Sequence, residues 1–390
     1  MFPSHDVSQP RCFPVTIRRL GNMGNCFPVT ISKQPEEKMK IAIDISPLKV
    51  GNYLQHTVRG VGFYLTNLQK ALEEYHPEHS YQYFVRGDKI DDDTDVIHYP
   101  YFEPFFITLP FQKIKKTVVT VHDLTPLVFP SLFPSGIKGK AKWVIQKKLL
   151  QRMDGVITDS HASEKDIVTL AKIPKELVHV IYLAAGNEFK QVKDQKKLQE
   201  IVQKYKLPEK FVLYVGDATP NKNLPSLIQA CINTKIPLVL VGKALADTRI
   251  DKHNVWNRDL IQAQRLISEH DTCIRLGFIS NEELICLYNL ATVFVLPSLY
   301  EGFGLPILEA MACGCPVVTT RNGSIPEVAG EAALYVPADV ASLSKGIHSV
   351  FTDTKRANAL SQQGILQAKK FSWRATADAT VKTYEKVMSQ

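Results

Sequence analysis

Segment 301–309 places a glutamate on either side of a glycine turn, a pattern that could bind an anionic ligand. The segment follows the apolar run 293–297 and leads into a helical pattern. The turn is therefore expected at the carboxyl end of a strand, where open α/β sheets bind ligands. A helix that begins there presents free N–H groups and its positive dipole end to an anion such as a nucleotide diphosphate. Gly302 and Gly304 would let the ligand approach the backbone, and Glu309 could accept hydrogen bonds from ribose hydroxyls. The alternative is an ordinary turn with a solvated glutamate at each end.

The elements that must position this turn alternate in type from residue 39 onward. Short β-branched runs alternate with helical patterns, which predicts parallel sheets joined by right-handed crossovers. The candidate strands of the first half are 40–44, 81–86, 95–99, 117–121, 155–159 and 178–183. Those of the second half are 211–215, 237–241, 272–276, 293–296, 316–320 and 332–336. Two similar sets of strands predict an α/β fold with two tandem Rossmann-like domains that face each other across a cleft.

The length of 390 residues agrees with two domains of about 150 to 200 residues each. We expect a first domain over 39–188, a polar linker over 189–207 and a second domain over 208–372. Residues 1–38 look like an appendage, because Cys-Phe-Pro-Val-Thr-Ile occurs twice in them. Our hypothesis is that Met39 is the real start and that the preceding segment is disordered or mistranslated.

Composition narrows the class of protein without identifying it. No run approaches the roughly 20 apolar residues that span a bilayer, and the N-terminus lacks the pattern of a secretory signal. We therefore expect a cytoplasmic chain. A net charge of +8 suits an anionic ligand or an anionic membrane surface, and by itself it neither chooses between them nor excludes nucleic acid. The seven cysteines are scattered, and the close pair Cys313 and Cys315 has no partners to complete a zinc site, so small buried thiols are expected.

A second glycine turn is predicted near the first strand, at residues 59–62. The sequence there is Arg-Gly-Val-Gly, and the helix that follows Gly62 has an apolar stripe with the spacing of one buried face. In a two-domain arrangement this turn would face the cleft opposite Glu301.

Short motifs occur in a characteristic order between residues 211 and 337. They lie at 214–216, 220–224, 275–280, 282–284, 296–309, 311–318 and 325–328, and the first half adds Gly60 with Gly62, 120–124 and 158–160. This order resembles the family 4 glycosyltransferases, which are retaining, nucleotide-sugar-dependent enzymes with two Rossmann-like domains (the GT-B fold). The resemblance covers nearly everything after residue 38. It implies that 39–188 binds the acceptor, that 208–372 binds the nucleotide sugar, and that a helix over 373–390 returns to the first domain.

The resemblance also implies roles for individual residues. The catalytic set would be His122, Glu301 and Asp123, with His122 beside the reacting carbon or the hydroxyls of the sugar. The donor-binding residues would be Gly62, Lys222, Gly302, Phe303, Gly304, Leu305 and Glu309. Lys222 and the amides of the 302–305 turn would neutralise the leaving diphosphate without a metal or another cofactor. His98, His161 and His179 are expected to be structural.

Two features bear on the neutralisation of charge. Many relatives carry Arg-Lys where this chain has Asn221-Lys222, so one cation of the expected diphosphate clamp is missing. Arg275, Arg321 or Lys243 could help, or could be solvated surface charges. An Asp-x-Asp pattern also occurs among Asp91, Asp93 and Asp95, which could hold a metal. We interpret that run as the solvated entrance to a strand.

The function predicted from these observations is transfer of a sugar from a nucleotide-diphosphate donor, with GDP-mannose mildly preferred over UDP-sugars. The acceptor would be a glycan or a lipid-linked oligosaccharide in cell-surface polysaccharide synthesis. The alternatives are a nucleotide-sugar hydrolase or epimerase with the same fold, and an inactive nucleotide-binding protein. Nucleic-acid binding has no aromatic-basic motif to support it.

A basic stretch over 138–152 allows one further partner. No Asp or Glu occurs between Asp123 and Asp154, whereas six basic residues do. Such a segment could contact anionic lipid at the inner face of the plasma membrane. Basic and apolar residues are not cleanly separated around a helix here, so an ordinary solvated helix is the alternative.

Overall fold

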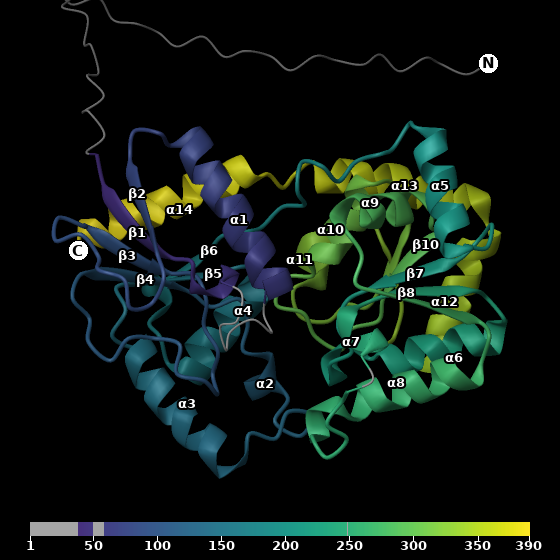
Figure 1. Ribbon diagram of the computed structural model, residues 1–390, viewed down its shortest axis with the longest axis horizontal. Helices are drawn as coiled ribbons and strands as arrows, with labels where there is room; N and C mark the ends of the chain where they lie inside the picture. The colour runs from purple at the N-terminus through teal and green to yellow at the C-terminus, as the bar shows by residue number, and fades with distance from the viewer. Residues whose placement is uncertain (1–37, 50–57, 248) are drawn as a thin grey trace, which may run out of the picture. The chain divides into compact units, whose positions relative to one another are not determined.

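The computed structural model describes residues 38–49, 58–247 and 249–390. Residues 1–37 of the predicted appendage lie outside the described residues, and the remaining chain, Lys38–Gln390, forms one unit. Its frame consists of two parallel six-stranded sheets, each with helices packed around it (Figure 1). We call the part built on strands β1–β6 the first lobe and the part built on β7–β12 the second lobe. The predicted α/β fold with two Rossmann-like domains is confirmed.

The first sheet has the strand order β2-β1-β3-β4-β5-β6. Its strands are β1 (Lys40–Asp44), β2 (Ser80–Phe84), β3 (Val96–Tyr99), β4 (Lys116–Thr120), β5 (Gly155–Thr158) and β6 (Val178–Val180). The interior strands β3 and β5 are buried at every residue, as expected for parallel strands that are covered on both faces.

The second sheet has the strand order β12-β11-β10-β7-β8-β9. Its strands are β7 (Val212–Val215), β8 (Leu238–Val241), β9 (Cys273–Gly277), β10 (Val293–Leu296), β11 (Val317–Thr319) and β12 (Leu334–Tyr335). Each predicted strand is found in the two sheets. The predicted strands 178–183 and 332–336 are shorter in the structure, where they form β6 and β12. Both are outer strands with a single neighbour, so pairing holds fewer of their residues.

The helices of the first lobe lie between its strands in sequence. The longer ones are α1 (Val58–Tyr75), α3 (Gly136–Leu150) and α4 (His161–Asp166), which continues into a π-helical turn at Ile167–Ala171. The short segments are η1 (Ser46–Leu48), α2 (Thr125–Val128) and η4 (Lys175–Leu177).

The second lobe contains more helices. They are α5 (Gln195–Tyr205), η5 (Pro220–Lys222), α6 (Leu224–Thr234), α7 (Lys243–Ala246), η6 (Val255–Asn257), α8 (Arg258–Glu269), α9 (Asn281–Leu290), α10 (Leu305–Ala312), α11 (Ile325–Ala329), α12 (Val340–Thr352) and α13 (Thr354–Ala368). The last helix of the chain is α14 (Trp373–Met388).

The predicted glycine turn at 59–62 is wrong, because Gly60 and Gly62 both lie inside α1. The buried stripe of this helix already begins at Val61 and continues through Tyr64 and Leu68. Burial of each large apolar side chain stabilises the helix by about 1.5–3 kcal/mol, whereas a glycine in a helix interior costs about 1 kcal/mol relative to alanine. Packing therefore extends the helix through both glycines.

The segment predicted as a linker, 189–207, contains helix α5. Asp194 caps this helix by accepting hydrogen bonds from the amides of Lys196 and Lys197. Leu198 and Ile201 are buried where α5 packs on α9, so much of the segment belongs to the packing of the second lobe.

Helix α14 returns to the first lobe, as predicted. It packs on α1, β4 and β5, and Figure 1 shows it in yellow beside the first sheet. Tyr384 of α14 is fully buried, and its hydroxyl lies 2.8 Å from Nδ1 of His98. The last helix therefore fastens the end of the chain to the core of the first lobe.

None of the helices in the described part of the chain combines the length and the apolar character that crossing a bilayer requires.

Candidate active site

Residues of both lobes line one cavity of about 430 Å³. The charged or titratable residues that line it are Glu103, His122, Asp123 and Asp159 from the first lobe, and Asp217, Lys222 and Glu301 from the second. Most of them lie shortly after a strand: His122 and Asp123 after β4, Asp159 after β5 and Asp217 after β7, whereas Glu301 lies on the loop between β10 and α10. The cavity therefore lies at the carboxyl ends of the strands of both sheets, where open α/β sheets bind ligands.

His122 is held by a buried carboxylate. Its Nδ1 lies 2.7 Å from Oδ2 of Asp159, and its ring packs edge-on against Tyr64 with ring centroids 4.9 Å apart. Burial alone lowers the pKa of His122. The charge and hydrogen bond of Asp159, together with the charge of Asp123 and the carbonyl of Pro100, outweigh that effect and raise the pKa above its ordinary value. Asp159 fixes the ring and favours its protonated form.

Within the second lobe, Lys222 and Glu301 form an ion pair in which Glu301 is buried and Lys222 partly buried. The lysine Nζ lies 2.8 Å from Oε1 and 2.7 Å from Oε2 of Glu301, and Ser298 donates to Oε1 at 2.5 Å. Burial lowers the pKa of Lys222, but Glu301 outweighs burial, with Asp217 and Asp123 adding to its effect, so the pKa is raised. The cation is thus kept charged and aimed at the residue that precedes the Gly302 turn.

The turn after Glu301 leads into the N-terminus of α10. Gly304 adopts φ +95°, a conformation that favours glycine, and Phe303, Gly304 and Leu305 all line the cavity. Pro306 has no N–H and the amide of Ile307 donates to the carbonyl of Gly304 at 2.9 Å, so the amides that can donate to a ligand here are those of residues 303–305. This geometry suits an anion beside Lys222.

Gly302 has a different role from the one expected from the sequence. A Cβ at this position would lie 2.6 Å from Cβ of Asp123 and 2.9 Å from the carbonyl oxygen of His122. The space that a side chain would need is therefore occupied by the first lobe rather than left open for a ligand. Gly302 lies outside the cavity lining, and its carbonyl accepts a hydrogen bond of 2.6 Å from the hydroxyl of Ser160.

A second contact between the lobes lies at the start of α4. The carboxylate of Glu327 accepts hydrogen bonds from the amides of His161, at 2.8 Å, and Ala162, at 2.9 Å. The hydroxyl of Tyr182 donates to the same carboxylate at 3.1 Å. Glu327 belongs to α11 of the second lobe, so a residue of one lobe caps a helix of the other.

Besides Gly302, two more predicted donor-binding residues lie outside the lining of the cavity. Glu309 is 7% exposed within α10, and its Oε2 accepts a hydrogen bond of 2.9 Å from Tyr288. Gly62 is buried in α1, where Gly60 and Val61 line the cavity instead.

Asn221, which stands where a second cation was expected beside Lys222, has a structural role. Asn221 donates to the carbonyl of Tyr300 at 3.0 Å and accepts from Thr219 at 2.8 Å, so its side chain supports the loop. Arg275 donates to the carbonyl of Leu245 at 3.3 Å.

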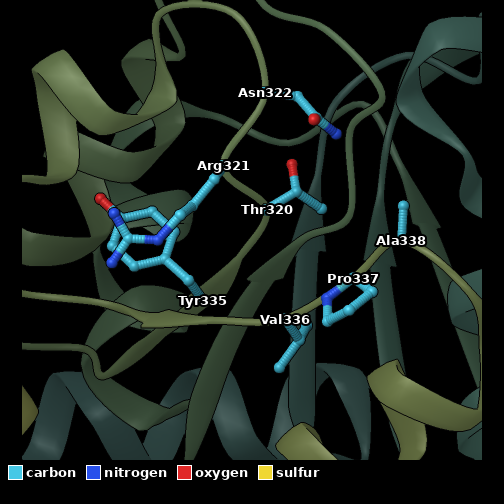
Figure 2. A pocket seen from close by; sticks show the side chains of 7 residues that line it. All are labelled: Thr320, Arg321, Asn322, Tyr335, Val336, Pro337 and Ala338. Carbon is cyan, nitrogen blue, oxygen red and sulfur yellow. The ribbon is translucent and has the colours of Figure 1, made fainter.

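Arg321 lies at a separate cavity of about 290 Å³, beside the loops that follow β11 and β12. Its guanidinium stacks on the ring of Tyr335, 4.1 Å from the ring centroid, as Figure 2 shows. In the described residues, neither Arg275, Arg321 nor Lys243 lines the larger cavity.

The acidic run 91–95 lies at the opposite end of the sheet from the cavity. It immediately precedes β3, where Asp93 pairs with the ammonium group of Lys40 and Asp95 accepts from its backbone amide. The interpretation of this run as the solvated entrance to a strand is confirmed.

One cluster in the described residues brings His76, Glu78 and His79 within metal-binding distance of one another. Nδ1 of His79 accepts a hydrogen bond from the amide of Met39, so a neutral His79 carries its proton on Nε2 and has no lone pair there for an ion. This hydrogen bonding does not suit a metal site. Nδ1 and Nε2 of the fully buried His98 each lie 2.8 Å from a hydroxyl, and burial lowers its pKa to about 3, which fits a structural role.

Sequence reasoning did not assign Asp159, Asp217, Glu103 or Trp256 to the site. The first two follow strands β5 and β7, so the rule that identified His122 could have found them. Glu103 and Trp256 come from irregular loops, and no local pattern in the sequence indicates which way a loop folds.

Comparison with known proteins agrees with this geometry. The family model described as Glycosyltransferase Family 4 matches residues 58–184, and the model described as Glycosyl transferases group 1 matches residues 194–367. O-antigen chain mannosyltransferase B of Escherichia coli is 32% identical over 303 residues, which are 75% of each chain. The serotype-specific mannosyltransferase WbdA of the same species is 29% identical over 73% of this chain. The match spans about a third of WbdA, 35% of its length.

Solved structures share the fold. Sucrose-phosphate synthase from Thermosynechococcus elongatus superposes with a TM-score of 0.71 at 22% identity, over 90% of this chain and 100% of that one. Anabaena HepE, solved in complex with UDP and glucose, has a TM-score of 0.66 at 19% identity, over 89% and 99% of the two chains. With both lobes matched by family models and a relative above 30% identity along most of its length, the chain belongs to glycosyltransferase family 4 and is a glycosyltransferase of the GT-B fold.

Proposed function

We propose that the protein is a retaining mannosyltransferase that moves mannose from GDP-mannose to a glycan or lipid-linked acceptor in cell-surface polysaccharide synthesis. The names of the two Escherichia coli relatives, both mannosyltransferases and one of them acting on the O-antigen chain, support the sugar and the class of acceptor. The observation that carries the proposal is the Lys222–Glu301 pair, which lies beside a turn of free amides and shares a cavity with His122.

The donor side of the mechanism follows from charge. Breaking the anomeric C–O bond leaves positive charge on the sugar and negative charge on the departing diphosphate. Lys222 and the amides of residues 303–305 are fixed before the donor arrives, so they stabilise the leaving charge with little reorganisation. Glu301 holds Lys222 in place and orients a hydroxyl of the sugar.

The remaining site residues complete the proposal. His122, kept protonated by Asp159, donates to the sugar near its reacting carbon, and Asp123 lies beside it. Glu309 binds the ribose, for which its hydrogen bond with Tyr288 must make room. The acceptor attacks on the face from which the diphosphate leaves, and a diphosphate oxygen takes its proton. No metal or other cofactor takes part.

Donor binding and transfer are tested separately. Purified protein is titrated with GDP-mannose, GDP, UDP-glucose and UDP by calorimetry, and transfer to a mannoside is followed with and without EDTA. We expect the tightest binding for GDP-mannose, transfer that survives EDTA, and an α-linked product detected by NMR. Consumption of donor at equal rates with and without acceptor would instead indicate a hydrolase or an epimerase. Transfer that vanishes with EDTA and returns with manganese would contradict metal independence.

We also propose that the first lobe contacts an anionic membrane surface. Ile137 is 89% exposed at the start of α3, and Phe111 and Ile114 are 66% and 58% exposed on the loop before β4. Lys138, Lys140 and Lys142 of α3 add positive charge, which anionic lipid attracts. The test is flotation with liposomes of phosphatidylcholine alone and with phosphatidylglycerol. Binding only to the anionic liposomes, lost in the variant Ile137→Glu, supports the contact, and equal behaviour with both liposomes contradicts it.

A further inference from the structure

A carboxyl group of the first lobe faces the same cavity without a part in the donor site. Glu103 lies on the loop between β3 and β4 and lines the cavity with His122 and Asp123. The donor-binding groups Lys222 and Glu301 come from the second lobe and already satisfy each other. Glu103 is therefore available to a different ligand.

The backbone of Glu103 is fixed by a buried polar network. Gln146 of α3 is completely buried and donates to the carbonyl of Glu103 at 2.9 Å and to the hydroxyl of Thr108 at 2.7 Å. That hydroxyl in turn accepts from the amide of Glu103 at 3.3 Å. These hydrogen bonds hold the loop through the carbonyl and the amide of Glu103. The carboxyl group of Glu103 takes no part in them.

Aromatic side chains form the neighbouring wall of the cavity. Trp256 of the second lobe packs edge-on against Phe133, with ring centroids 5.1 Å apart, and donates through Nε1 to the carbonyl of Pro134 at 3.2 Å. Trp256 and Phe133 both line the cavity that contains Glu103. Aromatic surface beside a fixed hydrogen-bonding group is the usual composition of a site that binds a sugar ring, which is apolar on its faces and polar at its edges.

The charges around Glu103 limit what this wall can bind. Asp123 and Asp159 are the other carboxyl groups on the first-lobe side, and His122 lies near them. Burial first, and then the charge of Asp123, raise the pKa of Glu103 to about 7, whereas a hydrogen bond from Tyr101 and the charge of His122 lower it. A negatively charged ligand would be repelled here, whereas a neutral hydroxyl can donate to a carboxylate.

We propose that Glu103 accepts a hydrogen bond from a hydroxyl of the acceptor's terminal sugar, whose ring packs against Trp256 and Phe133, and that this sugar is uncharged. The inference rests on the proposed function, because it assigns the acceptor side of the same reaction. It adds a residue that binds the acceptor from the first lobe while the donor is held by the second.

The test separates acceptor binding from donor binding. Octyl α-D-mannopyranoside serves as the acceptor probe and GDP-mannose as the donor, and the variants are Glu103→Gln, Glu103→Asp and the surface control Glu282→Gln. At pH 8, above the pKa of about 7 at which Glu103 ionises, we expect the KM of the mannoside to rise about tenfold or more for Glu103→Gln, because a hydrogen bond to a charged group is lost. The Kd of GDP-mannose from calorimetry should stay within about twofold of wild type. Glu103→Asp should recover part of the acceptor affinity, and Glu282→Gln should match wild type.

A second readout uses the charge of the probe. Wild type should use the corresponding octyl mannosiduronate poorly, and Glu103→Gln should narrow the gap between the charged and the neutral probe. An unchanged KM for the mannoside in a folded Glu103→Gln variant overturns the inference, and so does an equal loss of donor and acceptor affinity. Wild-type protein that binds GDP-mannose without transferring mannose to the probe contradicts the proposed function itself, and the acceptor role of Glu103 with it.

Discussion

The two walls of the cavity handle charge in opposite ways. On the second-lobe wall the ion pair of Lys222 and Glu301 is complete, with Ser298 satisfying a further lone pair, and a turn of amides lies beside it. On the first-lobe wall three carboxyl groups, Glu103, Asp123 and Asp159, lie around His122. The second-lobe wall also carries Asp217, yet it offers an anion a cation and a turn of amides, whereas the first-lobe wall presents mainly carboxyl groups. The difference indicates that the departing nucleotide and the incoming hydroxyl are handled by different lobes.

The largest loss of activity should follow from removing the cation of the second-lobe wall, on which the contrast between the walls depends. Lys222→Ala deletes the positive charge and leaves Glu301 buried without its partner. We expect kcat/KM for mannosyl transfer to fall about a thousandfold, with weaker binding of GDP in calorimetry. The control Lys197→Ala removes an exposed ion pair with Glu282 and should change neither quantity. Near-normal transfer by Lys222→Ala would show that the leaving charge is stabilised elsewhere.

Changing the histidine of the first-lobe wall should affect turnover rather than donor binding. For His122→Ala we expect kcat to fall about a hundredfold with little change in the Kd of GDP-mannose. Asp159→Asn should act through the same ring. Because Asp159 raises the pKa of His122, its loss should lower that pKa. The pH above which activity declines should therefore be lower in Asp159→Asn than in wild type. The exposed His348→Ala is the matched control. Equal losses of donor affinity in both site variants would contradict the division between the walls.

The contact between the two walls can be strained without removing any functional group. Gly302→Ala would place a Cβ 2.6 Å from Cβ of Asp123, so the lobes could not approach as closely as they do. We expect kcat/KM to fall about tenfold, because catalytic groups from the two lobes would be misplaced. Thermal unfolding should change little. Unchanged activity would mean that the lobes do not need this contact during the reaction.

The smallest expected effect concerns stability. The pKa of Glu103 is raised to about 7 in the folded protein, so folding favours its protonated form. This contribution is complete at acidic pH and is lost as the pH rises through 7. Glu103→Gln should therefore stabilise the protein at pH 8 by on the order of 1 kcal/mol and have little effect at pH 5. Thermal melts at both pH values, with Glu282→Gln as control, check the sign, and a larger gain at pH 5 would contradict it.

The walls also differ in how much of them the sequence could predict. The part of the second-lobe wall from Glu301 to Leu305 lies in one turn between β10 and α10, so local spacing around Glu301 and Gly304 was enough to predict it, and Lys222 came from the family resemblance. The first-lobe wall draws on loops far apart in the chain. His122 and Asp123 follow a recognisable strand, whereas Glu103 is held by Gln146, 43 residues away, and Trp256 comes from the other lobe.

Tertiary packing explains the other differences. The role expected for Gly302 assumed an approaching ligand, and only the folded chain shows that Asp123 occupies that space. The glycine turn at 59–62 was inferred from local preference, and the buried stripe of α1 overrides that preference. The alternation of strands and helices was strong enough to predict both sheets, because most of the parallel strands carry an apolar run, such as Val293–Leu296 in β10.

The carboxylate of Glu327 ties the integrity of one helix to the position of the opposite lobe. With the lobes together, it satisfies two amides at the start of α4, the helix that follows Asp159. If the lobes moved apart, these two amides would face solvent, and the start of α4 would lose the side chain that caps it. This segment directly follows Asp159, the residue that holds His122. Release of the nucleotide and loss of order around His122 would then occur together. The enzyme would therefore be least reactive when its cavity is open to water.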